Sequence, residues 1–401
     1  MIYDCIIVGG GAAGMCAAIT LARNNKQVLL IEQCKELGKK LSVTGNGRCN
    51  FTNSYYGGDC YRGDPSFAKE VIKQRDHEAT RSFFRSIGIM DQERDGYYYP
   101  YTNQARTVVN CFLSALQQEG VTVLADRIVR QVIRKKYGYH VITSYQDFDA
   151  RAVLLACGGK ASAFFKEESF GYRLAQDLGH TVTPLFPALC ALYVKEDITA
   201  LKGIRLTGAV TIYQDKERKH PVSPKKTGEI QFTRDTISGI PTFQVSRYAA
   251  QILAEQKVCY ASVDFFPYME KEALADWFCL KKDHSAWSKK ELLRHCSGML
   301  LDPVAELLVS NGAEQFLSRC KAYPFTITKT KPMKEAQVTA GGICTAEVDV
   351  KTMASKESDG LFLAGEMLDV DGTCGGYNLQ FAFATGSIAA EGMKKYLEKL
   401  K

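Results

Sequence analysis

A glycine-rich turn near the N-terminus limits the folds open to this chain more than any other feature. The turn reads Gly9-Gly10-Gly11-Ala12-Ala13-Gly14, and it follows a short apolar run at residues 3–8. Small and apolar residues at helical spacing come next, and a second apolar run ends at Ile31. This order of strand, tight turn, helix and strand predicts a βαβ unit with a parallel pair of strands.

The spacing of these glycines predicts a binding site for a dinucleotide. Gly9 permits the sharp turn off the strand, Gly11 lets the backbone approach a pyrophosphate, and Gly14 lets helix and strand pack closely. The first helical turn offers free amide groups and the positive end of the helix dipole to the phosphates. Glu32 ends the second strand, where a carboxylate accepts hydrogen bonds from ribose hydroxyls and disfavours a 2′-phosphate.

Further glycine-rich segments follow other predicted strands. The loop at residues 41–53 contains Thr44-Gly45-Asn46-Gly47-Arg48-Cys49-Asn50, which can hold a phosphate or a ring edge through backbone amides and Arg48. A strand near residues 360–364 ends in Gly365-Glu366, and residues 372–380 open the last helix. Several such segments at strand ends favour a large cofactor with two parts.

The chain of 401 residues is long enough for more than one domain, and 46% of its residues are hydrophobic. We predict an α/β fold in which the dinucleotide domain, at residues 1–187 and 337–401, is interrupted by inserted domains. A β-rich domain is predicted at residues 188–268 with 321–336, and a small helical domain at 269–320. Helices are also predicted near residues 65–88, 107–120 and 378–400.

Composition and spacing exclude several classes of protein. The net charge of +7 is mild; it suits a small anionic ligand and gives no case for nucleic acid. No apolar run is long enough for a membrane helix, and the first strand leaves no room for a secretory leader, so we expect a cytoplasmic protein. The fourteen cysteines include no C-x-x-C pair, which disfavours a metal site. The six histidines lie outside the glycine motifs, so we expect structural roles for them.

The motifs together resemble a bacterial family of FAD-dependent oxidoreductases. The resemblance rests on the N-terminal glycine turn, residues 44–50, Gln337-Val338-Thr339-Ala340-Gly341-Gly342, Gly365-Glu366 and Gly376-Tyr377-Asn378-Leu379-Gln380. That family includes aminoacetone oxidase-like enzymes and the bile-acid-inducible flavoprotein that reduces unsaturated 3-oxo bile acids. It implies a Rossmann-like FAD-binding domain interrupted by a β-barrel-like domain and a small helical domain.

The resemblance also implies which residues bind the cofactor. The glycine turn would hold the FAD pyrophosphate, Glu32 the adenosine ribose, and the backbone at Ile128 or Val129 the adenine. Gly365 and Glu366 would face the ribityl chain. Residues 378–380 would face the isoalloxazine. The full set of expected cofactor-binding residues is Gly9, Gly11, Ala12, Ala13, Gly14, Glu32, Lys40, Thr44, Gly45, Gly47, Arg48, Asn50, Val129, Gly158, Gly365, Glu366, Gly376, Asn378, Leu379 and Gln380.

By analogy with the bile-acid member, we expect NAD(P)H-driven reduction of a C=C bond in an apolar enone such as an unsaturated 3-oxo bile acid or steroid. No second G-x-G-x-x-G occurs, so NAD(P)H would dock transiently as the electron donor. A small hydrophobic or anionic substrate is expected, and Tyr97 and Tyr99 are the candidate catalytic residues because a phenol can donate a proton. An amine oxidase that produces hydrogen peroxide and a non-catalytic flavin-binding redox module remain as alternatives. The oligomeric state stays open.

Overall fold

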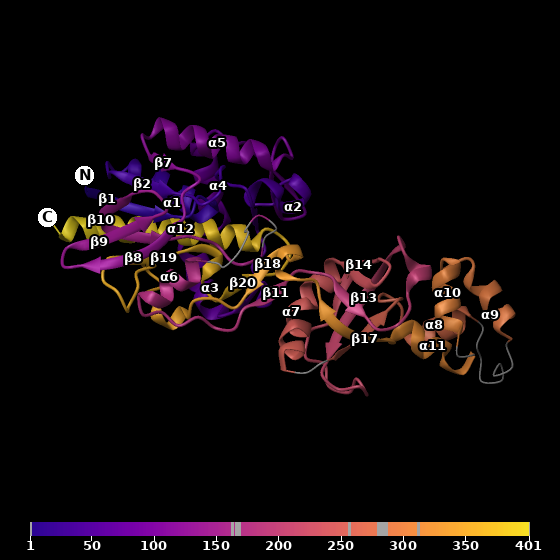
Figure 1. Ribbon diagram of the computed structural model, residues 1–401. Helices are drawn as coiled ribbons and strands as arrows, with labels where there is room; N and C mark the ends of the chain where they lie inside the picture. Colours follow the sequence, from indigo (N-terminus) through magenta and orange to yellow (C-terminus); the bar gives the residue numbers. More distant parts are fainter. Residues whose placement is uncertain are drawn as a thin grey trace. The chain divides into compact units, whose positions relative to one another are not determined.

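The computed structural model describes residues 2–161, 164, 170–255, 258–278, 288–310 and 313–400. The chain divides into two compact units (Figure 1). Unit 1 comprises Met1–Leu185 and Val338–Lys401, and unit 2 comprises Phe186–Gln337. These boundaries lie within two residues of the predicted ends of the dinucleotide domain. Each unit has a hydrophobic core of its own.

A mostly parallel sheet forms the centre of unit 1, in the order β7-β2-β1-β10-β9-β8, with β19 also beside β10. The β10–β9 and β9–β8 pairs are antiparallel, whereas the other neighbouring strands run parallel. In register, Val8 lies beside both Ile31 and Leu155, and Leu155 lies beside Leu363. The strands are β1 (Ile2–Val8), β2 (Val28–Ile31), β7 (Thr122–Leu124), β8 (Val129–Lys135), β9 (Gly138–Thr143), β10 (Asp147–Leu155) and β19 (Leu361–Leu363).

Helices cover this sheet, and α1 and α12 contact each other closely. A Cβ on Gly386 in α12 would lie 2.4 Å from the Ala13 carbonyl oxygen, so only glycine permits this approach. The helices of unit 1 are α1 (Ala12–Ala22), α2 (Thr44–Gly47), α3 (Pro65–Gln74), α4 (His77–Ser86), α5 (Ala105–Gln118), α6 (Phe170–Asp177) and α12 (Tyr377–Lys399), with short 3₁₀ turns η1 (Leu41–Val43), η4 (Thr345–Glu347) and η5 (Gly365–Met367). The 3₁₀ turn η3 (Met333–Glu335) belongs to unit 2.

The helix predicted near residues 65–88 is two helices, which corrects the sequence-based prediction. The chain breaks at Arg75 and Asp76, and the Asp76 carboxylate accepts a hydrogen bond from the Ala79 N–H at 2.9 Å. Asp76 is thus the N-cap of α4, a role for which aspartate is well suited.

The remaining strands of unit 1 are short. β4 (Tyr61–Gly63) pairs with β20 (Val370–Gly372), and β3 (Thr52–Asn53), β6 (Tyr97–Pro100) and β5 (Asp91–Arg94) form a three-stranded sheet. β18 (Val338–Ala340) is the first strand after the chain returns to unit 1.

Unit 2 contains a closed barrel in the order β12-β15-β14-β13-β16-β17. Its elements are β11 (Phe186–Ala188), β12 (Leu192–Val194), η2 (Thr199–Leu201), β13 (Arg205–Tyr213), β14 (Lys226–Phe232), β15 (Thr236–Gly239), α7 (Ile240–Glu255), β16 (Cys259–Asp264), α8 (Lys271–Trp277), α9 (Lys289–Cys296), α10 (Asp302–Val309), α11 (Ala313–Lys321) and β17 (Tyr323–Thr330). The sequence analysis missed α7, although Val245, Ala249 and Ile252 are buried at helical spacing against the barrel core.

The predicted fold class is confirmed, because a Rossmann-like sheet, a closed barrel and a helical part all occur. The predicted helical domain falls partly outside the described residues, since residues 279–287 and 311–312 are not described. Within the described parts of the chain, no helix has both the length and the apolar character needed to cross a membrane.

Candidate functional site

The candidate site begins where three parallel strands of unit 1 end side by side. β1 ends at Val8, β10 at Leu155 and β19 at Leu363, and these three residues are neighbours in register. The glycine turn, Cys157-Gly158-Gly159 and Gly365-Glu366 follow directly. The carboxyl ends of parallel strands are where α/β folds bind their ligands. Segments more than three hundred residues apart in sequence therefore meet at one edge of the sheet.

The glycine turn has the geometry that a pyrophosphate requires. Gly9 has a φ of +113°, and a Cβ on Gly14 would lie 1.9 Å from the Gly9 carbonyl oxygen. At Gly11, by contrast, a Cβ would meet no atom within 4 Å. Gly11 is the N-cap of α1, where no side chain caps the helix and no acidic residue lies in the first turn. The amides at Ala12 and Ala13 thus belong to a helix end that is free to bind an anion.

Glu32 is held in position at the end of β2. Its carboxylate accepts hydrogen bonds from the Gly10 N–H at 2.7 Å and the Cys34 N–H at 2.8 Å. The Arg127 N–H donates to the Glu32 carbonyl oxygen at 2.9 Å, and β8 begins two residues later at Val129. The predicted ribose and adenine contacts therefore lie on adjoining segments.

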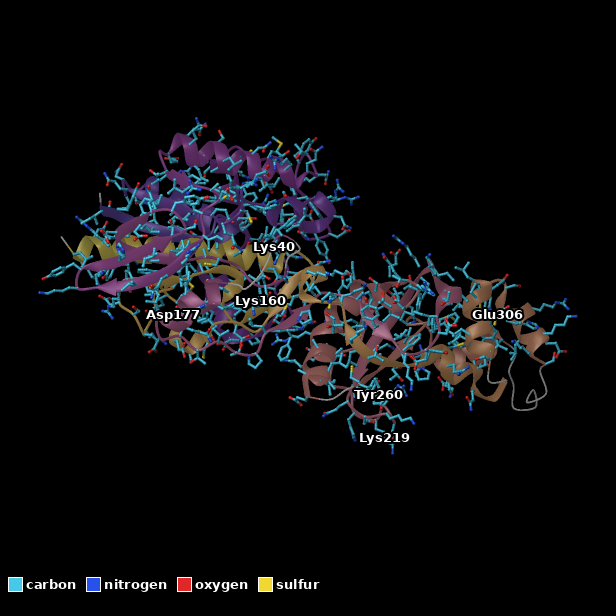
Figure 2. The ribbon with its side chains drawn as sticks, in the orientation of Figure 1. Lys40, Lys160, Asp177, Lys219, Tyr260 and Glu306 are labelled. Atoms are coloured by element: carbon cyan, nitrogen blue, oxygen red, sulfur yellow. The ribbon has the colours of Figure 1, made fainter. Side chains whose placement is uncertain are left out.

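An ion pair joins two of the predicted cofactor-binding residues. The Lys40 Nζ lies 2.6 Å from Glu366 Oε2, and Glu366 Oε1 accepts from the Thr339 N–H at 2.9 Å. Lys40 is labelled in Figure 2. A Cβ on Gly159 would lie 2.4 Å from Thr339 Oγ1, so the loop after β10 passes close to this pair. Gly158, with a φ of +74°, has open space where its Cβ would be.

The predicted phosphate loop at residues 44–50 adopts left-handed backbone conformations. Gly45, Asn46, Gly47 and Cys49 all have φ between 50° and 80°. The Thr44 hydroxyl donates to the Leu41 carbonyl oxygen at 2.7 Å. A run of left-handed residues costs free energy and is typical of functional loops. A Cβ on Gly47 would meet no atom within 4 Å, so the loop has room for a ligand at that position.

The Asn50 side-chain amide connects this loop to the start of α12. When its nitrogen faces β3 and β6, this amide donates hydrogen bonds to the carbonyl oxygens of Tyr98 at 3.1 Å and Thr52 at 3.0 Å. Gly376 is the N-cap of α12, with a φ of 88°, and its Cβ would lie 2.8 Å from the Thr52 carbonyl oxygen. The Arg48 side chain is exposed.

The side chains of Asn378 and Gln380 bind this protein's own backbone. The Asn378 amide both donates to and accepts from the main chain of Gly372, at 2.8 Å in each case. Gln380 is fully buried; its Oε1 accepts from Thr52 Oγ1 at 2.7 Å, and its Nε2 donates to the Arg75 and Asp76 carbonyl oxygens. Asn378 thus holds the turn before α12, and Gln380 joins α12 to β3 and to the break between α3 and α4. The predicted contact of residues 378–380, Leu379 included, with the isoalloxazine stays a prediction.

The small sheet β3-β6-β5 presents an outer face beside this turn. In register, Tyr97 lies between Asn53 on β3 and Arg94 on β5. Directly opposed residues in an antiparallel pair share a face, so these three side chains form a row. Asn53 Nδ2 donates to the Gly375 carbonyl oxygen at 3.1 Å, and a Cβ on Gly375 would lie 3.0 Å from the Tyr97 ring. Tyr97, which is 38% exposed, therefore lies next to the turn that opens α12.

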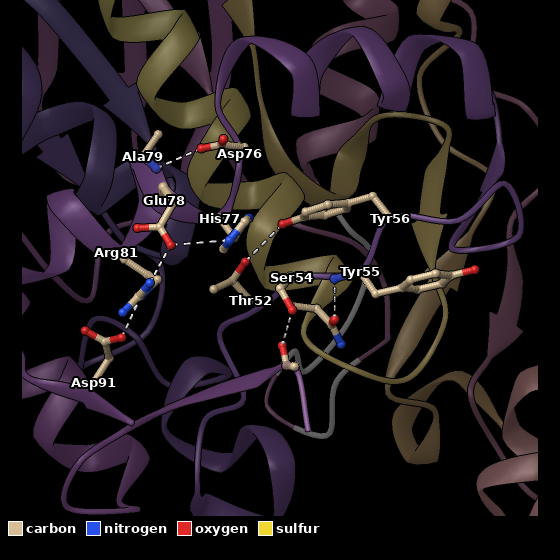
Figure 3. A network of polar contacts seen from close by, with 12 residues as sticks. Thr52, Ser54, Tyr55, Tyr56, Asp76, His77, Glu78, Ala79, Arg81 and Asp91 are labelled. Atoms are coloured by element: carbon tan, nitrogen blue, oxygen red, sulfur yellow. Dashed lines mark hydrogen bonds and ion pairs between the residues drawn. The ribbon is translucent and has the colours of Figure 1, made fainter. Parts of the chain in front are cut away.

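The inner face of the same sheet is held by a network of polar contacts (Figure 3). Thr52 Oγ1 lies 3.2 Å from the Tyr56 hydroxyl, and the His77 Nε2 lies 3.3 Å from Glu78 Oε1. Arg81 Nε donates to Asp91 Oδ2 at 2.6 Å, and its guanidinium lies over the Tyr98 ring. Tyr98 is buried while Tyr97 and Tyr99 point to the other face, as strand alternation requires. His77 thus lies within this network, and the structural role expected for it stays a prediction.

Burial affects the titration of Tyr99 and of the two cysteines near the site. Burial raises the pKa of Tyr99, with Tyr97 adding to the effect and Arg48 and Arg94 opposing it. Burial also raises the pKa of Cys49 to about 12 and that of Cys374 to about 11. Both thiols therefore stay protonated at neutral pH, which disfavours a thiolate reaction at this site.

The residues present fit a bound FAD. The strand ends supply an uncapped helix N-terminus, open positions at Gly11 and Gly158, and a fixed carboxylate at Glu32. These match what a pyrophosphate and a ribose require. Across the described ranges, no group of three or more histidine, cysteine, aspartate or glutamate side chains could hold a metal ion.

Two residues beside the site were missed by the sequence analysis as candidates. Asn53 holds Gly375, and Arg94 lies opposite Tyr97 across the β5–β6 hairpin. A signal was present in Asp95-Gly96, because Asp-Gly between two strands predicts a tight hairpin turn with both residues at positive φ. Their φ values are 52° and 84°. That turn would have fixed the pairing of Arg94 with Tyr97.

Similarity to known proteins extends over the whole chain. The family model described as the HI0933-like protein Rossmann domain matches residues 3–392. The 3-dehydro-bile acid delta(4,6)-reductase of Clostridium scindens is 39% identical over 401 residues, covering 96% of this chain and 97% of that protein. The ribosomal RNA dihydrouridine synthase of Escherichia coli is 24% identical over 403 residues, covering 97% of each protein.

Among solved structures, the fold resembles a 3-ketosteroid delta1-dehydrogenase from Sterolibacterium denitrificans in complex with 1,4-androstadiene-3,17-dione. The TM-score is 0.53 at 13% identity, with 98% of this chain and 99% of that chain covered. The open conformation of a flavocytochrome c3 fumarate reductase gives a TM-score of 0.51 at 14% identity, with 99% and 78% covered. At such identities the likeness concerns the fold alone.

Proposed function

The chain belongs to the HI0933-like family of Rossmann-domain proteins, and from that premise we propose that it reduces carbon–carbon double bonds conjugated to a carbonyl group. The family membership expected from the sequence motifs is confirmed. The chain is an FAD-dependent oxidoreductase. The finer points, namely the substrate, the electron donor and the catalytic residues, are the proposal.

One observation carries this proposal: the 39% identity to a 3-dehydro-bile acid delta(4,6)-reductase along nearly the full length of both chains. The name of that relative describes reduction of double bonds in a 3-oxo compound. The name of the more distant relative, a dihydrouridine synthase, describes saturation of a double bond in a uracil ring. Both are reductions next to a carbonyl, and we propose an unsaturated 3-oxo bile acid or steroid as the substrate here.

The strand ends of unit 1 would hold the cofactor. The glycine turn and the N-terminus of α1 would bind the pyrophosphate, Glu32 the adenosine ribose, and the Lys40–Glu366 pair would lie along the ribityl chain. When bound, FAD supplies the hydride for the substrate, and NAD(P)H supplies the electrons. The balance is NAD(P)H, one proton and the C=C bond giving NAD(P)⁺ and the saturated CH–CH bond.

Tyr97 is the proposed proton donor. Addition of hydride to the β-carbon of an enone leaves negative charge on the substrate, and a proton must then reach its α-carbon or its oxygen. The Tyr97 ring lies beside the Gly375 turn, next to Asn53, and its exposure leaves it open to a substrate. Tyr99 lies on the same face, where its raised pKa keeps it protonated as part of the site wall.

The test is an anaerobic titration of the purified FAD-bound protein with NADH and then NADPH, followed by a 3-oxo-4-ene bile acid. We expect the flavin absorbance to bleach with one nucleotide and to return when the enone is added. In a separate assay in air, hydrogen peroxide formed from oxygen on adding an amine would point to the oxidase instead. Flavin that neither nucleotide reduces would point to the non-catalytic module.

Tyr97→Phe tests the proton donor. We expect kcat for the enone to fall roughly 100-fold, which is the lower range for losing a general acid, while FAD content stays the same. Tyr101→Phe is the matched control, because Tyr101 is 65% exposed in the turn directly after the strand of Tyr97, and the change should leave kcat unchanged. An unchanged kcat in Tyr97→Phe would exclude Tyr97 as the proton donor.

A further inference from the structure

We propose that Arg94 binds an anionic group of the substrate, so that the site prefers an apolar enone that carries a negative charge away from its reacting carbons. This inference rests on the proposed function, since it concerns the same site. It assigns a residue that determines specificity and plays no part in the proton transfer.

The position of Arg94 follows from the pairing of the small sheet. Asn53, Tyr97 and Arg94 lie side by side on the outer face of β3, β6 and β5. Neighbouring strands are about 4.8 Å apart, so Arg94 lies about 10 Å from Asn53 across the sheet. Asn53 and Tyr97 contact the Gly375 turn, whereas Arg94 is at the far end of the row. A substrate that reacts between Tyr97 and the Gly375 turn and extends over the Tyr97 ring toward β5 would reach Arg94.

Arg94 differs from the other arginines around the sheet in its partners. On the inner face, Arg81 and Arg85 both form ion pairs with Asp91. Arg94 is exposed and donates to the neutral Gln92 side chain at 3.1 Å, and no carboxylate of the described residues forms an ion pair with it. Its positive charge therefore remains free to meet an anion.

The surroundings of Arg94 suit an apolar molecule with a charged end. Its guanidinium lies 5.9 Å from the centre of the Tyr99 ring. The exposed Arg48 also acts on Tyr99, and both cations oppose the effect of burial on the pKa of that phenol. Tyr97 and Tyr99 offer aromatic surface, while a planar guanidinium can bind a carboxylate or a phosphate through two parallel hydrogen bonds.

The charges nearest to Arg94 leave this interpretation intact. Glu93 precedes Arg94 in the chain, but its carboxylate accepts a hydrogen bond from the Gly96 N–H and lies on the opposite side of the strand. Asp95 is exposed in the hairpin turn. The anion could come from a carboxylate of the substrate or from a phosphate of the nicotinamide nucleotide. We assign it to the substrate, because Tyr97 and Arg94 share one row.

The experiment uses the FAD-bound full chain and two probes, 3-oxo-4-cholenoic acid and its methyl ester, which differ only in the charge. In the wild-type protein we expect a lower KM for the acid than for the ester. In Arg94→Gln we expect KM for the acid to rise roughly tenfold, the scale of one charged hydrogen bond at a partly exposed site, with kcat nearly unchanged. KM for the ester should stay the same.

Two further variants serve as controls. Arg94→Lys keeps the charge without the paired hydrogen bonds, so it should recover part of the lost affinity. Arg134→Gln removes an exposed arginine from β8, on the central sheet, and should change neither KM. The difference in KM between the acid and the ester should also decrease as the salt concentration rises, because salt screens exposed charges.

Failure of this inference can be told apart from failure of the proposed function. Binding of acid and ester to the oxidised protein, followed by the shift in flavin absorbance, gives two dissociation constants without turnover. Equal constants in the wild-type protein, or no change in Arg94→Gln, would overturn the role of Arg94. A rise in KM for NADH or NADPH alone in Arg94→Gln would overturn it too, since the anion would then be the nucleotide phosphate. If neither probe is reduced although the acid binds more tightly, the proposed reaction fails and Arg94 stands.

Discussion

At the scale of single residues, the glycines of the N-terminal turn differ in what a methyl group would meet. In Gly14→Ala the new Cβ would lie 1.9 Å from the Gly9 carbonyl oxygen, within a buried strand-to-helix turn. We expect a loss of about 3 kcal/mol in the free energy of unfolding, because backbone atoms must move to make room. In Gly11→Ala the Cβ meets no atom, and φ is an ordinary −85°.

Gly11→Ala is therefore the matched variant. Its stability should stay within about 0.5 kcal/mol of the wild-type protein, since nothing in the folded chain is displaced. Its affinity for FAD should fall roughly tenfold, because the methyl group occupies the space in which the pyrophosphate approaches the backbone. Urea unfolding of the protein without FAD and titration of FAD by fluorescence measure the two effects. Equal FAD affinity in Gly11→Ala and the wild-type protein would place the pyrophosphate elsewhere.

Single residues also mark how far the sequence could predict the site. The spacing of Gly9, Gly11 and Gly14 and the position of Glu32 follow from the chemistry of a pyrophosphate and a ribose, and local sequence suffices to recognise them. The hydrogen bonds of Gln380 could not be predicted in this way. Its partners Thr52, Arg75 and Asp76 are more than three hundred residues away, and only the folded chain brings them to the start of α12.

At the scale of elements, one histidine fastens the segment after α6 to the loop around η4. His180 is buried; its Nδ1 lies 3.1 Å from Glu347 Oε2, and its Nε2 lies 2.8 Å from Ser355 Oγ. Burial lowers the pKa of His180, although the neighbouring Glu347 opposes the shift. Burial alone would raise the pKa of Glu347. Hydrogen bonds from Thr181 and His180 to its carboxylate outweigh the effect of burial, so the pKa of Glu347 is lowered.

The sign of the pH effect follows from these directions. A histidine with a lowered pKa binds fewer protons when folded, so its contribution to stability is present above about pH 6.5 and is lost as pH falls below it. Glu347 adds a similar loss below about pH 4.5. Between pH 7 and pH 5 we expect the free energy of unfolding to decrease, by at most about 1.4 kcal/mol per pH unit from this one proton. Urea unfolding at several pH values measures the slope.

His180→Gln gives the control for this slope. Glutamine keeps hydrogen-bonding groups at the position but does not titrate, so its unfolding free energy should fall less steeply between pH 7 and pH 5. An identical slope in His180→Gln and the wild-type protein would assign the pH dependence to other groups.

Elements were predicted best where their signals are local. The end of α12 and the strands of the central sheet have clear apolar patterns, and they fall close to the predicted ranges. The break at Asp76 carried a capping signal that the helical pattern around it concealed. α7 was missed because strands surround it in sequence, and its buried face becomes clear only against the barrel it packs on.

At the scale of the whole molecule, the chain leaves unit 1 after Leu185 and returns at Val338. The glycine motifs at both ends of the sequence predicted this interruption, since Gly365 must come back to the sheet that Gly9 begins. The return to the sheet is made by β19, which pairs with β10, and β10 in turn pairs with β1. The sequence could not predict the pairing of the barrel strands, because short strands with alternating apolar residues are compatible with many strand orders.

The separate cores of the two units lead to a prediction about heat denaturation. The core of unit 1 and the core of unit 2 share no residue, and every expected FAD-binding residue lies in unit 1. We therefore expect two transitions in differential scanning calorimetry, because domains with separate cores commonly unfold in separate steps. A ligand that binds one folded unit stabilises that unit only.

FAD at about 100 times its dissociation constant should add about 2.7 kcal/mol to unit 1, which raises one of the two midpoints by roughly 5–10 °C. The other midpoint should stay where it is, because every expected FAD-binding residue lies in unit 1. Gly11→Ala serves as the internal control: at the same FAD concentration the shifted midpoint should move less, while the unshifted one stays the same. If both midpoints rise together in the wild-type protein, unit 2 contributes to FAD binding or unfolds with unit 1 as one cooperative body.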